Sequence, residues 1–471
     1  MKKVLAMLLT LCLVIGLGGT FTLAEEAPVT IRWATVGSGM PANYDAWKAK
    51  MDEYLGEKIG VNIEMEVVSW GDWENRRNVI INTNEPFDII FGNSDVYTAD
   101  ALLGSYLDIG DMLATAAPEL QAMIPASYWD ACRINGKIYA VPTYKDSSQT
   151  EYIVWDKDLL DRLEIDASEA TTFEAMTPIL TKIVEDTNSA AFLLSQSGAT
   201  YLNYQYDSMS CGLSAVGVRF NDTEGKVVPV FEQEDIMAYL TQFHEWYNAG
   251  IINSDAATLP EDNKYKPCSM AQGWPSAALT TWGPNMGVNA VAYQWENTIV
   301  SNDTVRGSLN SVSVNSEHPE KALALLELIN TDAYVRDSFY YGLEGADWDY
   351  TDAGTIHRNT YDWTMAGYTQ GTFFEVTPTD DVDFNQWDEV KALNEQAQPS
   401  VLLGFTFDTA AVADQIANCT EIFNRYKGEL LTGTVDPADA VPAMMAEMRD
   451  GGFDEIVTAA QAQVDVFMAA K

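Results

Sequence analysis

Basic residues are scarce in this sequence. Its 471 residues include 27 lysines and arginines against 69 aspartates and glutamates, which gives a formal net charge of −42. Binding to nucleic acid relies on Lys and Arg at the phosphates, and docking on anionic lipid relies on basic clusters. The charge therefore argues against both kinds of partner, and we interpret the acidic surface as a source of solubility.

Histidine is rarer still. His244, His318 and His357 are the three in the chain, and none belongs to an HExxH or related metal-binding pattern. The sequence also contains no GxSxG elbow, no P-loop and no GxGxxG after a strand. We therefore expect no catalytic residue, no metal site and no cofactor. A glycosidase-type pair of carboxylates stays open among so many acids, although no pair stands out by its local context.

Cysteine is infrequent and shows no metal-binding pattern. Cys12 lies in an apolar amino-terminal stretch, and Cys132, Cys211, Cys268 and Cys419 have no CxxC spacing. Four cysteines in an exported protein permit disulfides in three pairings. Four small buried thiols are the alternative, since a chain of this size does not need disulfides to fold. The sequence leaves both states open.

Long apolar runs are absent except at the amino terminus. Two lysines precede the apolar stretch Val4–Gly19, and the small residue Ala24 stands before two glutamates. This pattern predicts a secretory signal peptide at residues 1–24, because the run is shorter than the ~20 residues of a membrane span. We expect an exported protein, either extracellular and associated with the cell surface or periplasmic. Cys12 lies in a poor lipobox, so we expect no lipid anchor.

The amino-terminal part of the chain alternates between strand and helix patterns. Val29–Val36, Val61–Val68 and Phe87–Phe91 are predicted strands, and Asn43–Ile59 is a predicted helix ended by Gly60. The alternation indicates an α/β fold with a largely parallel sheet, in which ligands collect at the carboxyl ends of the strands. Those ends are Ser38–Met40, Trp70–Trp73 and Asn93–Asp95.

The stretch Gly136–Asp158 interrupts this order. Two short strand patterns, Ile138–Val141 and Tyr152–Trp155, flank a polar, turn-rich middle. Pro142 lacks an N–H group and cannot sit inside a central ladder, so the first strand should end there. A chain of this length divides into more than one domain. We interpret the stretch as a hinge passage between two lobes.

Aromatic side chains are abundant, with 13 tryptophans and 22 tyrosines. The turn Trp70–Trp73 combines two indoles with a carboxylate, and the loop-like region 338–375 is dense in aromatic residues. Aromatic faces stack on the apolar faces of sugar rings, while carboxylates and amides accept hydrogen bonds from sugar hydroxyls. Instead of binding a ligand, each tryptophan could be a buried core residue, and Asp95 could cap a helix.

The same features resemble the extracellular solute-binding proteins of ABC importers, the large family 1 group that includes sugar binders. Gly136–Pro142 and Tyr152–Leu160 look like the strand–hinge–strand signature of that family. The helix that starts at His318–Ala322 is similar to its "PEKA" helix. Leu403–Asp408 resembles a subgroup with a carboxy-terminal domain of unknown function.

The resemblance implies an α/β, two-lobed, periplasmic-binding-protein-like fold of type II, with a ligand cleft between the lobes and three hinge crossings. On this sequence the first lobe would comprise residues 28–145 plus 272–312, and the second 146–271 plus 313–471. The crossings would lie near 143–151, 268–274 and 309–316. The family also implies a non-catalytic protein, which we expect to be a monomer, that delivers a small solute, here an oligosaccharide, to the permease subunits of an importer.

The candidate ligand-binding residues come from the strand ends, the hinge and the aromatic stretches. They are Ser38, Trp70, Asp72, Ser94, Asp95, Tyr144, Lys145, Trp282 and Trp363. Two alternatives stay open. The same fold could bind a peptide or another polar solute, with Lys145 facing a carboxylate. The chain could also be a secreted carbohydrate-active enzyme with a carboxylate pair across the cleft.

Overall fold

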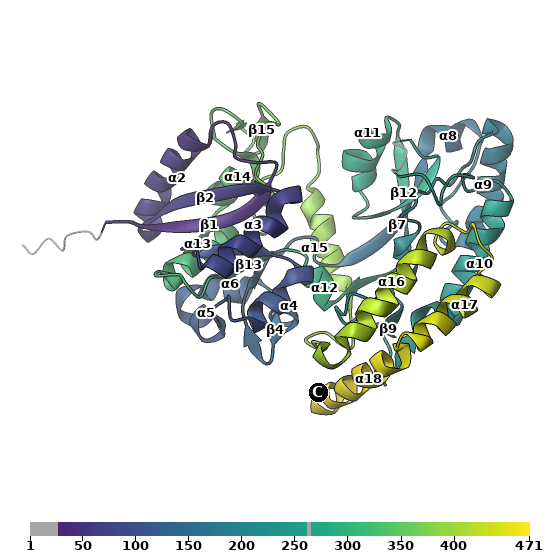
Figure 1. Cartoon of the computed structure of the whole chain (residues 1–471). Coiled ribbons are helices and arrows are strands. Elements are labelled where there is room, and N and C mark those ends of the chain that lie inside the picture. The colour runs from purple at the N-terminus through teal and green to yellow at the C-terminus, as the bar shows by residue number, and fades with distance from the viewer. Residues whose placement is uncertain (1–26, 261–264) are drawn as a thin grey trace, which may run out of the picture.

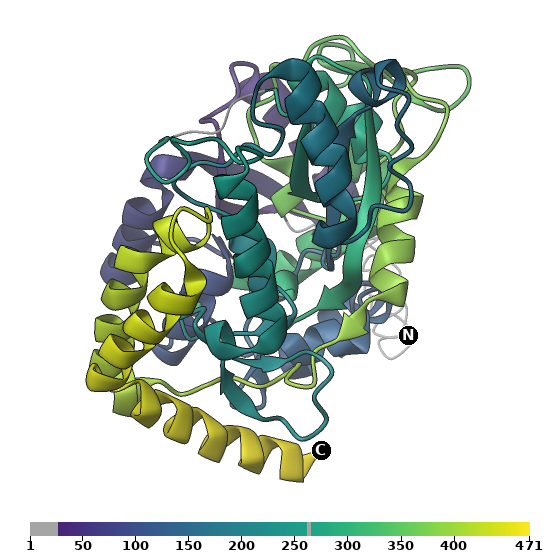
Figure 2. The same ribbon diagram turned by 90° about the vertical axis from the view of Figure 1, so that its right-hand side faces the viewer.

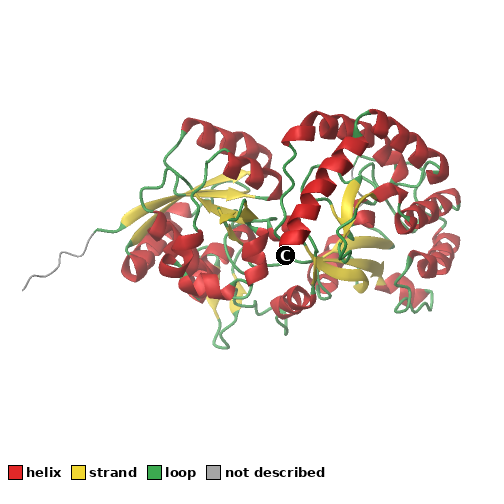
Figure 3. Cartoon of the chain, turned by 90° about the horizontal axis from the view of Figure 1, so that it is seen from below, coloured by secondary structure: helices red, strands yellow, loops and turns green. Residues whose placement is uncertain are grey.

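The chain folds into two lobes, each with its own sheet and its own hydrophobic core (Figure 1). The computed structural model describes residues 27–260 and 265–471. The expected signal peptide, residues 1–24, lies outside the described residues. Seen from below, the strands of the two sheets form separate groups surrounded by helices (Figure 3).

The first lobe is built on a five-stranded sheet with the order β2-β1-β3-β13-β6. Strands β1, β2 and β3 are parallel, whereas β13 runs antiparallel to β3 and to β6. The predicted strands and the helix between the first two are confirmed, and Gly60 ends that helix in a left-handed conformation with φ 64°. The elements of this lobe are β1 (Val29–Gly37), α2 (Tyr44–Ile59), β2 (Val61–Ser69), α3 (Trp70–Thr83), β3 (Ile89–Gly92), α4 (Ser94–Leu102), α5 (Gly110–Ala116), α6 (Pro118–Met123), α7 (Ala126–Ala131), β4 (Arg133–Ile134), β5 (Lys137–Ile138), β6 (Val141–Pro142), β13 (Leu309–Val312), α13 (Pro319–Thr331), α14 (Ala333–Tyr341), β14 (Trp348–Tyr350) and β15 (Ile356–Arg358).

The second lobe is built on a four-stranded sheet with the order β11-β7-β12-β16, beside a small sheet β10-β9-β8. Strand β7 is central and antiparallel to both neighbours. Near the carboxyl end, α17 packs against α10 and α16, and the carboxy-terminal helices stand out in yellow in Figure 2. The elements are β7 (Gln149–Asp156), α8 (Lys157–Arg162), α9 (Phe173–Thr187), β8 (Tyr206–Asp207), β9 (Val216–Arg219), β10 (Val227–Pro229), α10 (Glu234–Asn248), β11 (Cys268–Gln272), a π-helix at Ala278–Trp282, α11 (Gly283–Met286), β12 (Ala290–Val300), β16 (Gln398–Pro399), α16 (Ala413–Leu430), α17 (Pro437–Asp450) and α18 (Phe453–Ala470).

Two expected lobe assignments need correction. Strand β12 was expected in the first lobe with residues 272–312, but it pairs with β7 in the second sheet. Helices α13 and α14 were expected in the second lobe, but their apolar faces lie in the core of the first. The local pattern correctly indicates the strand and α13, whereas the end of α14 lies in the region 338–375 that was expected to be loop-like. No local pattern carries information about which sheet an element joins.

Three segments connect the lobes. The first crossing, 143–148, joins β6 to β7 and agrees with the expected one at 143–151. The second, 301–308, contains the short helix α12 (Asn302–Val305) and joins β12 to β13. The third, 377–397, contains α15 (Gln386–Gln396) and leads into β16. The expected crossing at 268–274 is wrong, because β11 stays inside the second sheet. The expected crossing at 309–316 is also misplaced, because the chain crosses at 301–308 and residues 309–312 already form β13 of the first sheet.

Within the described residues, no helix combines the length and the hydropathy that a membrane span requires. The cysteines at 132, 211, 268 and 419 are all buried free thiols.

Candidate ligand-binding site

The three crossings are tied together by polar side chains at the base of the two lobes. Thr143 donates its backbone N–H to the Ser308 carbonyl at 3.0 Å, and the two hydroxyl oxygens lie 3.0 Å apart. Asn394 on α15 accepts from the Ser148 backbone N–H at 3.0 Å and donates to the Lys145 carbonyl at 2.5 Å. These hydrogen bonds join the first crossing to the second and the third, although the same segments also bury Tyr144, Val305 and Trp387.

Glu151 lies at the start of β7, directly after the first crossing. Its side chain is 4% exposed and accepts a hydrogen bond from the Gln149 amide at 2.9 Å. Burial raises the pKa of Glu151 above its ordinary value of 4.5, and the Gln149 contact opposes the shift. The folded state therefore holds this proton more tightly than the unfolded state does.

We expect Glu151→Gln to raise the free energy of unfolding at pH 8. A folded-state pKa above the unfolded value means that the wild type gains stability as the pH falls through that folded pKa. Gln cannot ionise, so the advantage of the variant should shrink as the pH approaches 4.5. Urea unfolding of both proteins from pH 4.5 to pH 8 measures the difference. A difference that stays constant with pH would contradict this role for Glu151.

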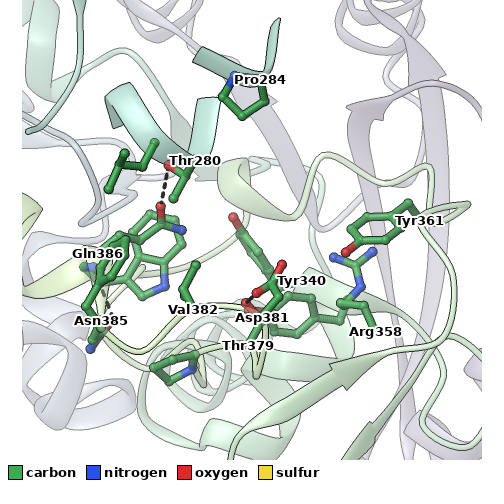
Figure 4. Close-up of a pocket in the computed structure, with 15 residues that line it drawn as sticks. Thr280, Pro284, Tyr340, Arg358, Tyr361, Thr379, Asp381, Val382, Asn385 and Gln386 are labelled. Carbon is green, nitrogen blue, oxygen red and sulfur yellow. Dashed lines mark hydrogen bonds between the residues drawn. The ribbon is translucent and has the colours of Figure 1, made fainter. Parts of the chain in front are cut away.

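A cavity of about 460 Å³ lies between the lobes beside the third crossing (Figure 4). The second lobe contributes residues of the π-helix and α11, and the first lobe contributes residues of α14, β15 and the loop after it. The lining residues are Leu279, Thr280, Pro284, Tyr340, Tyr341, Arg358, Tyr361, Pro378, Thr379, Asp381, Val382, Phe384, Asn385, Gln386 and Trp387.

The chemistry of this cavity combines aromatic faces with hydrogen-bonding groups. Arg358 lies over the rings of Tyr341 and Tyr361, with 5.0 and 4.5 Å from its guanidinium carbon to the ring centroids. Tyr361 is 73% exposed. Figure 4 shows Tyr361 and Arg358 on one side and Asn385 and Gln386 on the other. A flat apolar face together with amides suits a ligand that has apolar faces and hydroxyl edges, as a sugar ring does.

A second aromatic pair, Trp70 and Tyr368, lies at the strand ends of the first lobe. Trp70 is 49% exposed, and its ring packs edge-on against Phe91 at 5.8 Å. Burial raises the pKa of Tyr368, while a hydrogen bond with the Trp70 side chain lowers it and the charge of Asp146 raises it. Burial also raises the pKa of Tyr340, which lines the cavity, and the charges of Arg336 and Arg358 oppose that shift.

The sequence-predicted residues of the strand ends come together at one edge of the first sheet. Ser38, Trp70, Asp72, Ser94 and Asp95 follow the parallel strands β1, β2 and β3 directly. Asp72 accepts a hydrogen bond from the Ser69 hydroxyl at 2.6 Å in the first turn of α3. Asp72 and Asp95 are both exposed. Their role in ligand binding stays a prediction.

The remaining candidates are occupied by contacts within the protein. Tyr144 is 7% exposed and packs edge-on against Tyr128 and Phe374. Lys145 forms an ion pair with its neighbour Asp146.

Both remaining tryptophans are half-buried. Trp282 packs against Tyr152 at 5.8 Å. Trp363 donates its indole N–H to the Phe339 carbonyl at 3.1 Å and packs against Trp47 at 5.5 Å. A role of Tyr144, Lys145, Trp282 and Trp363 in ligand binding stays a prediction.

Several residues of the site were not selected from the sequence. Tyr361 and Tyr368 belong to the aromatic region 338–375, whose density was the available signal. Arg358, Asn385 and Trp387 carried no local signal, because only the third crossing brings α15 beside β15. Among the described residues, no group of three or more His, Cys, Asp and Glu side chains is placed to hold a metal ion.

Comparisons with known proteins agree with this architecture. A family model described as bacterial extracellular solute-binding protein matches residues 37–336, and a model of a domain of unknown function matches residues 401–469. A carbohydrate ABC transporter substrate-binding protein of Streptococcus pneumoniae is 27% identical over 452 residues, covering 92% of this chain and 89% of the relative.

Solved structures show the same periplasmic-binding-protein-like fold. The N-glycan transport solute-binding protein NgtS of S. pneumoniae is 24% identical and superposes with a TM-score of 0.85, covering 94% of this chain and 99% of NgtS. Structures of NgtS in complex with Man1GlcNAc and Man5GlcNAc superpose with TM-scores of 0.75 and 0.72, covering 93% and 94% of this chain and 99% of each NgtS chain.

Proposed function

Because the chain belongs to the bacterial extracellular solute-binding protein family, a family of binding proteins rather than enzymes, we propose that it captures an oligosaccharide between its lobes and delivers it to an ABC importer. The observation that carries the proposal is the cavity whose walls come from both lobes and from the third crossing. The exposed rings of Trp70 and Tyr361 supply stacking faces, and Asp381 and Asn385 supply hydrogen-bonding groups.

The arrangement of the lobes supports capture by hinge bending. A ligand that contacts both lobes binds the closed arrangement better than the open one, and so shifts the population towards closure. The polar crossings provide the bend.

Delivery requires export and a membrane partner. Family membership implies an exported location, and we propose that the closed form docks as a monomer on the permease subunits of an importer. The protein would be periplasmic in a cell with an outer membrane and displayed on the cell surface in a cell without one.

A peptide or another polar solute is the alternative ligand in the same fold. Lys145 was the sequence-based candidate for a ligand carboxylate, but its ammonium group already contacts Asp146. Arg358, stacked between two tyrosine rings in the cavity, is the better candidate for that contact. Blocking the carboxylate of the ligand would then abolish binding.

Titration calorimetry tests the proposal. The probes are Man1GlcNAc, Man5GlcNAc and maltose on one side, and free amino acids with di- and tripeptides on the other. We expect binding of at least one oligosaccharide and of no peptide. Binding of a peptide without any sugar would overturn the sugar assignment. Release of shorter sugars during prolonged incubation would instead support the enzyme alternative.

A further inference from the structure

The segment 400–408, here called the latch turn, opens the carboxy-terminal domain of unknown function and touches both lobes. Leu402, Phe405 and Phe407 belong to the core of the second lobe. Leu403, which stands between them, belongs to the core of the first lobe. Gly404 follows in a left-handed conformation with φ 89°. A side chain at Gly404 would lie 3.4 Å from the Asp130 carbonyl of the first lobe, so the two segments approach closely there.

Two residues of the second crossing hold the latch turn. The Asn302 side chain accepts from the Gly404 backbone N–H at 2.9 Å and donates to the Phe405 carbonyl at 2.5 Å. Arg306 donates from Nη2 to the Thr406 hydroxyl at 3.2 Å and from Nε to the Ala131 carbonyl at 2.7 Å. Arg306 is fully buried and anchored in the first lobe through Ala131. Its bond to Thr406 therefore joins the two lobes.

Helix α18 holds the latch turn from the second lobe. Gln463 both donates to and accepts from the Asp408 backbone, at 2.9 Å in each case. The Phe467 ring packs against Phe405 at 5.4 Å between centroids. Lys471 donates to the Val401 carbonyl at 2.8 Å. These contacts tie the turn to α18 of the second lobe, whereas Arg306 is bonded to the first lobe through the Ala131 carbonyl.

The latch turn contacts α12 and the carboxyl end of α18, and none of its residues lines the cavity. Figure 1 shows α11 and β15, which carry the cavity residues Pro284 and Arg358, along the upper edge. The carboxyl end of α18 lies at the lower edge, with α12 and α15 between them, and it is again at the bottom in Figure 2. Bending about the crossings that narrows the upper edge must widen the lower one.

We propose that the latch turn, through its bond to Arg306, holds the two lobes open and so sets the affinity for the ligand. Closing the cavity separates Thr406 from Arg306 and Gly404 from Asp130. Under this proposal the contacts break when the lobes close, so each one that is lost subtracts from the binding energy that the ligand supplies. This assigns a role to the start of the domain of unknown function. The effect on affinity rests on the proposed ligand capture, whereas the effect on the lobes does not.

Thr406→Val tests the latch, with Thr406→Ser as its matched control, since only the serine keeps the hydroxyl. Both variants carry exposed labelling sites, Glu57→Cys on α2 and Glu185→Cys on α9, and the native cysteines are buried. Single-molecule energy transfer between the two labels reports the distance between the lobes without any ligand. We expect a larger closed population in Thr406→Val and the wild-type distribution in Thr406→Ser. An unchanged or more open distribution in Thr406→Val overturns the proposal.

Affinity provides the second readout. A charge-assisted hydrogen bond contributes ~1.5 kcal/mol, so we expect Thr406→Val to bind the oligosaccharide probe about tenfold more tightly. Weaker binding or unchanged affinity in Thr406→Val overturns the claim that the latch turn sets the affinity for the ligand. Arg425→Gln removes an exposed ion pair to Glu447 in the same domain and should leave both readouts unchanged. If no sugar binds at all, the proposed ligand fails, and the label distances still decide whether the latch exists.

Discussion

Replacing Trp70 with alanine is expected to weaken oligosaccharide binding about 30-fold, a loss of ~2 kcal/mol, with little change in stability. The ring is half exposed at the end of β2, beside Tyr368. Its exposed part can therefore stack on a sugar ring, while the ring also packs against Phe91. Calorimetry with the glycan bound by the wild type measures the loss.

Two variants control for this result. Trp70→Phe keeps a smaller stacking face and should retain most of the affinity. Val79→Ala alters another exposed apolar residue of the same helix, farther from the strand end, and should change nothing. Full affinity in Trp70→Ala would mean that the ligand does not reach this edge of the sheet. The cavity lined by Tyr361 would then have to hold the ligand alone.

Replacing Trp47 with alanine should, in contrast to Trp70→Ala, act mainly on stability. We expect it to lower the stability of the first lobe by ~3–5 kcal/mol. Trp47 is fully buried on α2. Its indole N–H donates to the Ser338 carbonyl at 2.9 Å, and its ring packs edge-on against Phe339 at 5.0 Å. The substitution leaves a cavity between α2 and α14 and removes one of the two hydrogen bonds to the Ser338 carbonyl, which still accepts from the Gly342 N–H.

Hydrogen exchange resolved by segment shows which lobe is affected. Amides of α2, α13 and α14 should lose protection in Trp47→Ala, while those of β7 and β12 should keep theirs. If β12 loses protection together with α2, then β12 belongs to the first lobe, as expected from the sequence. Trp70→Ala serves as the surface control for this experiment, because both tryptophans belong to the first lobe.

Much of the local structure could be predicted from the residues. The apolar runs before Gly37 and Ser69, and the glycine after Ile59, specify two strands and the helix between them through short-range packing and backbone preferences. Pro142 and the polar stretch after it marked the first crossing, because a residue without an N–H group ends the ladder. The family motifs then predicted two lobes and the type of ligand.

The candidate site was less predictable. Trp70 was found because it follows a recognisable strand, and Tyr361 was noticed only as one of many aromatic residues in a loop. Trp363 looks the same in the sequence, yet its indole is bonded to Phe339 inside the first lobe. The solvent exposure of the side chain distinguishes Trp70 and Tyr361 from Trp363. That exposure depends on which other parts of the chain pack against each ring.

The amino-acid sequence alone indicates an exported α/β binding protein with a polar hinge after Pro142, since composition, periodicity and turn residues act over a few positions. Only the tertiary structure shows that β12 joins the second sheet, that α13 and α14 complete the first lobe, and that the latch turn inserts Leu403 into that lobe. Those pairings link residues more than a hundred positions apart. They are selected by the packing of whole lobes, which no local pattern encodes.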